Sequence, residues 1–495
     1  MGIVFVLIFL TVFLYILKNT RRARIINSKI PGPIGLPYIG NLLSLRGEVH
    51  LKFDEWYKKY GPIYSIRMGN IDTVVLTEYS TLKKAFVDNA YSFTDRYQLK
   101  SRIQINGAKD IVNQNGKKHE ILKKVILSEI TSTKVKKYEN NIIGEAGRLI
   151  SFFDKHAEDG RPFSISGYVY LYAVNIIIRF LFGDELCWEN VDLAKNFLNG
   201  LFSFADEGTV LSDFITIPFY KHNKRYFELY DLLFKEIKNF IEMYLKIKKD
   251  KIKNGLYNPE EDNSIISKLI IEYEKGNITW DCLSHTCADI IGAGSFTTAN
   301  AIFCAIIEMA NNPSIQNKTH NDVLSGLNNY EDIILNHSKY RSNFPYLSMV
   351  IKETFRKYPS VLLGVPHMTT DDVIVDGYKI AAGTQVFQNI YSSQMSEKVF
   401  PSPNEFIPER FNKACDKEVN SNLLLFGIGV RDCIGKSLSE SEIFTILATL
   451  IYRYEFINPS QSPLKNVESL GVILNIPETK IILKKKLTRN GNFNK

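Results

Sequence analysis

Apolar residues recur at helical spacing over most of the chain, and this pattern predicts a mainly helical protein. Residues 82–273 carry the pattern, with breaks at glycine and proline. Single helices are also predicted at Asp54–Tyr60, from Thr279 to about Asn311, from Phe344 to Tyr358 with Pro345 at its start, and from Lys436 to about Tyr454.

A smaller part of the chain has the alternating or β-branched pattern of strands. The segments are Ile63–Met68, Thr73–Leu76, Val373–Val375, Tyr378–Ile380 and Lys480–Leu483. Asp376-Gly377 separates two of them and is typical of a tight hairpin turn. We therefore expect small β-sheets beside the helices.

The first residues predict a membrane anchor outside the globular fold. From Gly2 to Leu17 only Thr11 and Tyr15 interrupt an apolar run, and basic residues follow it. No basic segment precedes the run, which makes a cleaved signal peptide the weaker interpretation. Residues 1–18 are predicted to cross a membrane, with the basic flank and the body on the cytosolic side. The endoplasmic reticulum is the expected membrane.

Residues 19–40 are predicted to form a basic stop and a Pro-rich hinge. Pro31-Gly32-Pro33 and Pro37 restrict φ and remove backbone donors, which favours a stiff, extended connector. Residues 41–495 remain for one large domain.

Composition excludes some classes of protein. The chain has 495 residues, of which 45% are hydrophobic, so most of it can bury a core. Its net charge of +8 is small for this length and spread along the chain, which argues against nucleic acid as a partner. The six cysteines form no C-x-x-C pair, which indicates reduced thiols in the cytosol.

One cysteine lies in a setting that suits metal binding. Cys433 stands in the segment FGIGVRDCIG, residues 426–435, directly before the helix predicted from Lys436. The N–H groups and dipole at a helix N-terminus stabilise a thiolate, the form that binds a metal. The glycines let backbone pass close to a flat cofactor, and Arg431 can meet a carboxylate.

This segment resembles the haem-binding loop of the cytochrome P-450 family, whose pattern is F-x-x-G-x-R-x-C-x-G. It matches at all five fixed positions: Phe426, Gly429, Arg431, Cys433 and Gly435. The resemblance implies haem b as the cofactor, with Cys433 as the axial iron ligand and Phe426 and Gly429 beside the haem. It also implies that residues 41–495 form one haem-thiolate catalytic domain, mainly α with small β-sheets (α+β). A buried cysteine in a Gly-rich turn is the alternative.

A second match concerns a structural cluster. Glu353 and Arg356 lie at i, i+3 on a predicted helix, and Arg410 follows in the sequence Pro-Glu-Arg-Phe. The resemblance implies that these three side chains form a buried Glu-Arg-Arg cluster that locks the segment carrying the cysteine loop.

A third match lies in the long helix predicted from Thr279. Residues 293–298, AGSFTT, resemble the oxygen-activation segment of the family, and Thr297 matches its threonine, which supports protonation of oxygen. The alternative is that the glycine serves helix packing and the threonine bonds to the i−4 carbonyl. Most family members carry an acid where this chain has Phe296, so we expect slower or less coupled oxygen cleavage.

The resemblance also nominates partners for the haem carboxylates. Arg431, His367 and Arg96 match cationic or donor positions of the family. Where the family has Trp-x-x-x-Arg, this chain has His119 and Lys123 at the same spacing. Lysine lacks the bidentate fork of arginine, so Lys123 is the weaker partner.

The resemblance implies a monooxygenase that inserts one oxygen atom from O2 into a lipophilic small molecule. Electrons from NADPH would arrive through a flavoprotein reductase docked on a basic face. The candidates for that face are Lys117, Lys118, Lys123 and Lys124.

Two other functions stay open. One is a reductase-independent haem-thiolate isomerase or dehydratase, which Phe296 favours and Thr297 disfavours. The other is a non-catalytic haem-binding sensor. The substrate is indicated only as lipophilic, because the candidate pocket walls are mostly apolar. These walls are Ser101–Ala108, the stretch around Phe202–Pro218, Ala293 and Val361–Val365.

Overall fold

The computed structural model describes most of the domain predicted at residues 41–495. The described residues are 11, 29–36, 39–45, 47–100, 102–103, 107–183, 224–256, 262, 264–327, 333–412, 417–465, 468–470, 473–475 and 477–486. The predicted anchor, apart from Thr11, and most of the hinge lie outside them. So do the pocket wall at Phe202–Pro218 and part of the wall at Ser101–Ala108.

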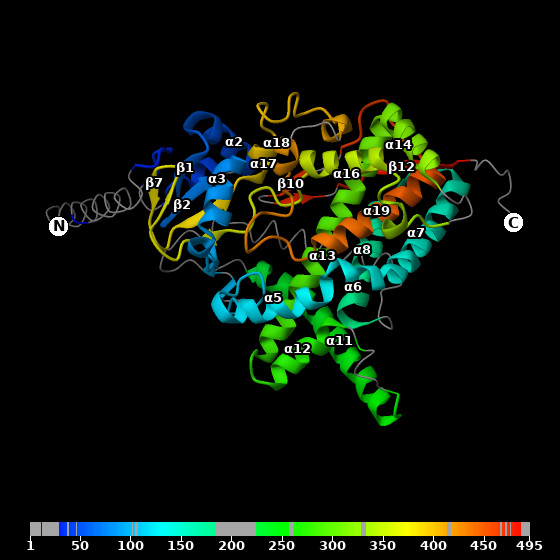
Figure 1. The fold of residues 1–495 in the computed structure, drawn as a ribbon, viewed down its shortest axis with the longest axis horizontal. Coiled ribbons are helices and arrows are strands. Elements are labelled where there is room, and N and C mark those ends of the chain that lie inside the picture. The colour runs from blue at the N-terminus through cyan, green and yellow to red at the C-terminus, as the bar shows by residue number, and fades with distance from the viewer. Residues whose placement is uncertain are drawn as a thin grey trace, which may run out of the picture.

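Helices form most of the structure, and several of the strands lie next to the N-terminal end (Figure 1). The longer helices are α2 (Val49–Tyr60), α5 (Gly116–Ile130), α7 (Glu139–Asp159), α8 (Ser166–Phe182), α11 (Lys224–Lys253), α12 (Ile265–Glu274), α13 (Trp280–Asn311), α14 (Pro313–Gly326), α16 (Pro345–Lys357) and α19 (Lys436–Arg453). The shorter ones are α3 (Tyr79–Lys83), α6 (Ser132–Lys137), α15 (His337–Tyr340), α17 (Ile390–Gln394) and α18 (Lys417–Ser421).

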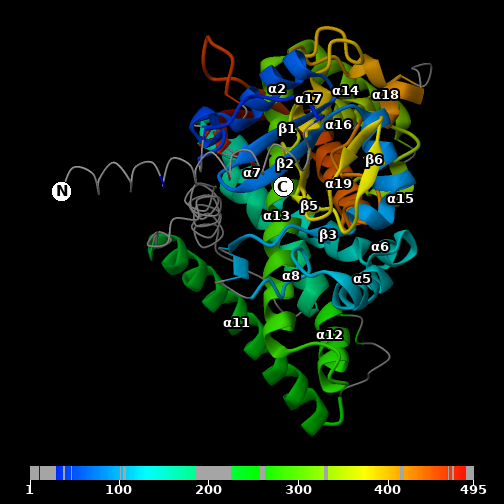
Figure 2. The ribbon, with the colours of Figure 1, turned by 90° about the vertical axis from the view of Figure 1, so that its left-hand side faces the viewer.

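Helix α13 is the central element of the helical part. It extends from the end where α11 and α12 lie into the body, and it packs against α8 and α19 (Figure 2). The Thr279 side chain caps its N-terminus by accepting from the Cys282 N–H at 3.2 Å, and Asn312-Pro313 ends it. Among the described residues, α13 alone is long and apolar enough to span a membrane. Because 72% of its apolar window is buried inside the fold, it is a core helix.

The largest sheet has five strands in the order β1-β2-β8-β5-β3. Its strands are β1 (Ile63–Met68), β2 (Ile71–Leu76), β3 (Asp95–Arg96), β5 (His367–Met368) and β8 (Gln385–Gln388). The β2–β8 pair is parallel and the others are antiparallel. This sheet brings Arg96 opposite His367, so two of the predicted haem partners share one edge.

The remaining sheets are small. The hairpin of β6 (Val373–Val375) and β7 (Tyr378–Ile380) turns at Asp376 and Gly377, which have φ of 47° and 81°. Positive φ at both central residues is the geometry that this dipeptide favours. A three-stranded sheet joins β4 (Phe163–Ser164), β12 (Lys480–Lys485) and β9 (Tyr454–Ile457), and β10 (Glu468–Leu470) pairs with β11 (Ile473–Asn475).

Within the described residues, which leave out 184–223 of the predicted helical stretch, the predicted elements are confirmed with small shifts of their ends. Helices α13, α16 and α19 and the hairpin strands agree with the expected ranges within one residue. Helix α2 begins five residues earlier than predicted, because Val49, Phe53 and Trp56 are spaced to bury one helical face. The fold is mainly helical with small sheets, as expected.

Candidate functional site

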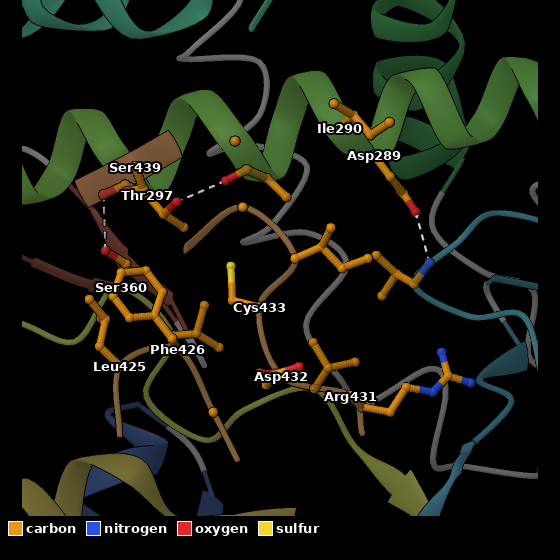
Figure 3. A pocket seen from close by; sticks show the side chains of 18 of the residues that line it. Asp289, Ile290, Thr297, Ser360, Leu425, Phe426, Arg431, Asp432, Cys433 and Ser439 are labelled. Carbon is orange, nitrogen blue, oxygen red and sulfur yellow. Dashed lines mark hydrogen bonds between the residues drawn. The ribbon is translucent and has the colours of Figure 1, made fainter. Parts of the chain in front are cut away.

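A cavity of about 350 Å³ lies between α13 and the loop that precedes α19. Its lining is mostly apolar, and the size is within the range of sites that enclose a small molecule or cofactor. The Cys433 sulfur points across the cavity toward α13, which passes over it with Thr297 (Figure 3). The predicted loop and the predicted oxygen-activation segment therefore face the same space.

Backbone hydrogen bonds fold the cysteine loop tightly. The Cys433 N–H donates to the Phe426 carbonyl at 2.8 Å, and the Asp432 N–H donates to the Gly429 carbonyl at 3.2 Å. Gly429 has φ of 90°, and a Cβ there would lie 2.2 Å from the Phe86 carbonyl oxygen. Only glycine satisfies both conditions, so Gly429 sets the path of the loop beneath the cavity.

The surroundings of the Cys433 thiol act on its charge in opposite directions. Burial raises the pKa of Cys433, whereas hydrogen bonds from the backbone of Gly435 and Lys436 lower it. The net effect raises the pKa of Cys433. A bound metal ion deprotonates such a ligand.

Two arginines stand at one side of the cavity, Arg96 buried and Arg431 partly buried. Arg96 donates to the Val365 carbonyl at 2.7 Å, while its Nε is buried and has no partner among the described residues. Arg431 donates to the Thr94 carbonyl at 2.8 Å and the Gln114 carbonyl at 2.6 Å. Burial lowers the pKa of Arg96 to about 9 and of Arg431 to about 10, and the charge of Arg431 adds to the shift of Arg96.

His119 and Lys123 reach the same cavity from α5. Burial, followed by the charges of Arg431, Lys123 and Arg96, lowers the pKa of His119 to about 3. Lys123 donates to the Val430 carbonyl and lies 3.6 Å from an Asp432 carboxylate oxygen. Arg96, Arg431 and Lys123 thus give this side of the cavity positive charge, which two carboxylates would balance. The residues present are suited to the propionates of a haem.

Both ring nitrogens of His367 already have hydrogen-bond partners within the protein, which the sequence did not predict. Its Nδ1 lies 2.7 Å from the Phe93 carbonyl oxygen and therefore donates a hydrogen bond to it. Its Nε2 lies 3.2 Å from the Gln388 amide nitrogen. Burial lowers the pKa of His367 well below its usual range, which agrees with a neutral ring. In this neutral ring Nε2 carries no proton, so His367 can donate to a carboxylate only if Gln388 turns away and Nε2 takes up a proton. Gln388 is a cavity residue that sequence reasoning missed.

In α13, Thr297 makes the hydrogen bond to the i−4 carbonyl that was expected as the alternative to a role in oxygen activation. The Thr297 hydroxyl donates to the Ala293 carbonyl at 2.9 Å, a bond to residue i−4. A Cβ on Gly294 would lie 2.8 Å from Ile177 of α8, so this glycine also allows close helix packing. Phe296 is buried in the main core.

The predicted Glu-Arg-Arg cluster is assembled and almost completely buried. Arg356 donates to Glu353 through Nε at 2.7 Å and Nη2 at 2.8 Å, and the Arg410 Nε donates to the same carboxylate at 3.2 Å. The Ile407 N–H adds a further bond at 2.9 Å. Glu353 thereby joins α16 to the segment around Pro408–Phe411.

Two acids of the cavity were missed by sequence reasoning. Glu442 lines it from α19, and Asp289 lines it from α13. Asp289 lies eight residues before Thr297, about two helical turns, so spacing alone could have placed both on one face. Its Oδ2 accepts from the Val112 N–H at 3.2 Å, as Figure 3 shows, and its carboxyl group is hydrogen-bonded to Asp110.

Burial and Asp110 together raise the pKa of Asp289 well above its usual range. The folded protein then binds a proton that the unfolded chain releases above about pH 4, so this group makes stability fall as pH rises. We expect Asp289→Asn, which keeps the hydrogen bonds without titrating, to flatten the fall of the thermal midpoint between pH 5 and 8. The control is Asp281→Asn, since Asp281 is an exposed residue of the same helix. Equal slopes in wild type and Asp289→Asn would contradict the expectation.

A thiol below a largely apolar, cation-rimmed cavity in a mainly helical fold defines a protein of the haem-thiolate class. The chain matches the family model described as Cytochrome P450 over residues 30–483, and it belongs to that family. Its members are monooxygenases that bind haem b, so this protein is a haem b oxidoreductase.

Relatives from Dictyostelium discoideum match almost the whole chain. "Probable cytochrome P450 513A3" is 52% identical over 97% of this chain and 99% of its own length. "Probable cytochrome P450 513E1" is 43% identical over 97% of this chain and 99% of its own length. "Probable cytochrome P450 513A1" is 42% identical over 97% of this chain and 98% of its own length.

Proposed function

We propose that the protein inserts one oxygen atom from O2 into a lipophilic small molecule, using electrons from NADPH that arrive through a flavoprotein reductase. The observation that carries this proposal is the shared cavity of Cys433 and the α13 segment around Thr297. Its mostly apolar walls favour a lipophilic substrate. When bound, haem supplies the redox-active iron at which oxygen is activated.

Each chain residue then has a distinct part. Cys433 would hold the haem iron through its sulfur, and Phe426 and Gly429 would shape the loop that carries this cysteine. Arg96 and Arg431 would bind the haem carboxylates, with His119, Lys123 and His367 as further partners. The buried Nε of Arg96, which has no hydrogen-bond partner among the described residues, supports these assignments.

Thr297 is proposed to hold and pass a proton on the cavity side of α13. Its hydroxyl donates to the Ala293 carbonyl at 2.9 Å and so keeps its oxygen open toward the cavity as an acceptor. A rotation about its side chain would turn the proton toward the cavity. The tight packing of Gly294 on Ile177 fixes the helix while this occurs.

The electron partner is proposed to dock on α5. Lys117, Lys118 and Lys124 are exposed there and suit an acidic flavoprotein surface. Lys123 is turned toward the cysteine loop and contributes less to that face. We further propose that residues 1–18 anchor the protein in the endoplasmic reticulum membrane, that residues 19–40 form the hinge, and that residues 41–495 face the cytosol as the catalytic domain.

The test is turnover with an NADPH-dependent flavoprotein reductase over a panel of lipophilic compounds. A monooxygenase consumes one NADPH and one O2 for each product in a fully coupled cycle. Product formed from a peroxide without NADPH would favour the isomerase or dehydratase alternative. Bound haem with no turnover of any compound would favour a sensor.

The presence of Phe296 next to Thr297 leads to a prediction about the product formed per electron consumed. An aromatic side chain cannot relay a proton, so we expect wild type to release peroxide at the expense of product. Phe296→Asp should raise the product formed per electron consumed. Because Phe296 is buried in the core, the variant will be less stable, and the ratio must be measured on the haem-loaded fraction. Phe296→Leu is the control, and an unchanged ratio in Phe296→Asp would defeat the hypothesis.

A further inference from the structure

Helix α19 carries a carboxylic acid inside the cavity that the proposed mechanism does not use. Glu442 is fully buried, with 0% of its surface exposed, and it lines the same cavity as Cys433. Its backbone carbonyl accepts from the Tyr172 hydroxyl at 2.9 Å, which ties this turn of α19 to α8. The acid is therefore held in place on α19, the helix that follows the cysteine loop.

The carboxyl group itself has no hydrogen-bond partner among the described residues, at either Oε1 or Oε2. Several neighbours in the cavity wall are apolar, including Ile126, Ile130 and Ile443. An ionised carboxylate without a partner is strongly disfavoured in such a place. Burial accordingly raises the pKa of Glu442 well above its usual range.

Other titratable groups line the same cavity as Glu442 or face α19 from the neighbouring elements. Those that share its cavity are Arg96, His119, Lys123, Asp289, His367, Arg431, Asp432 and Cys433. Tyr172 of α8 interacts with Glu442 and with Glu145 of α7, His337 of α15 contacts Phe444, and His320 of α14 bonds to the Ile451 carbonyl. No salt bridge joins any of these cations to Glu442 among the described residues.

We propose that Glu442 is a proton-holding residue whose ionisation is coupled to the charge of the haem iron. The inference rests on the proposed binding of haem iron by Cys433 in this cavity. One electron added to the site, from a flavoprotein or from dithionite, increases its negative charge and strengthens proton binding by a nearby acid. The proton comes from solvent, and the O–H bond forms at the Glu442 carboxylate, so electron and proton balance.

The coupling has a defined sign. At low pH Glu442 is protonated in both oxidation states, and the reduction potential does not depend on it. At higher pH, where the oxidised protein has lost this proton and the reduced protein regains it, the potential falls as pH rises. The limiting slope for one proton and one electron is about 59 mV per pH unit.

The experiment is an equilibrium redox titration of the haem-loaded protein from pH 6 to 10, in wild type and Glu442→Gln. We expect the alkaline fall of the potential to be reduced or absent in Glu442→Gln. The matched control is Glu440→Gln, two residues away on the same helix, which removes a partly exposed carboxylate paired with Arg341 at 3.8 Å. That control should keep the wild-type profile. Superimposable profiles for wild type and Glu442→Gln would overturn the proposal.

A second measurement, on wild type, tests the proposal even if Glu442→Gln fails to bind haem. Reduced-minus-oxidised infrared spectra of wild type at alkaline pH should contain a new band of a neutral carboxylic acid that shifts in D2O. Absence of that band would also overturn the coupling. The spectrum of the reduced, carbon monoxide-bound protein, recorded on the same samples, separates this failure from a failure of Cys433 ligation.

Discussion

Replacing Cys433 by alanine is expected to abolish the strongly red-shifted Soret band of the reduced, carbon monoxide-bound protein. Turnover should fall by on the order of 10³-fold or more, which corresponds to about 4 kcal/mol of barrier. The physical reason is that a thiolate at Cys433 would donate electron density to the haem iron, which favours oxygen activation. Absorption spectra and turnover per haem, both with reductase present, measure the two effects.

Cys282→Ala is the control for Cys433→Ala. Burial raises the pKa of Cys282 to about 11, so this thiol stays protonated, and it lies near the start of α13. The control should keep the red-shifted band with only a small loss of stability. A wild-type protein that binds haem without that band would contradict thiolate ligation, and the sensor alternative would then become the better explanation.

Local sequence signals predicted the elements that carry the site because each contains its own start and stop. Thr279 caps α13 with its side chain, and Asn312-Pro313 ends that helix. Asp376-Gly377 adopts positive φ at both positions, which brings β6 and β7 together without help from distant residues. A side chain at position 429 would collide with the Phe86 carbonyl, so the path of the loop requires glycine there.

Non-local pairing could not be predicted in the same way. Strands β5 and β8 are short, and β8 is held beside β2 by a parallel pairing between residues about 310 positions apart in the chain. Strand β5 lies between β8 and β3, and its pairing with β3 sets His367 opposite Arg96. The same packing brings Phe93 and Gln388 to the two ring nitrogens of His367. Partners of this kind depend on tertiary packing and leave no local pattern.

The largest structural effect is expected from Glu353→Gln. The Glu353 carboxylate is completely buried, as is Arg356, and it accepts from both Arg356 and Arg410. Removing its charge leaves two guanidiniums without their counter-ion, and breaking a buried pair of this kind costs about 3–5 kcal/mol. We expect a lower urea midpoint and loss of haem incorporation.

We expect loss of haem incorporation because the Glu353 cluster connects α16 to the backbone that precedes the cysteine loop. Arg356 also donates to the carbonyls of Gln394, Pro403 and Glu405, so α16 holds the backbone that leads toward the cysteine loop. Without that support the loop no longer presents Cys433 to the cavity in one conformation. Turnover per bound haem should therefore change less than the fraction of protein that carries haem.

Glu409→Gln supplies the matched control for Glu353→Gln. Glu409 is adjacent to Arg410 but is largely exposed, and its pair with Lys318 at 2.8 Å lies in solvent. Such a surface pair contributes about 0–1 kcal/mol, so the control should load haem normally and unfold close to the wild-type midpoint. If Glu353→Gln also loads haem as wild type does, the cluster does not position the loop. Its two arginines would then be held adequately by their backbone carbonyls alone.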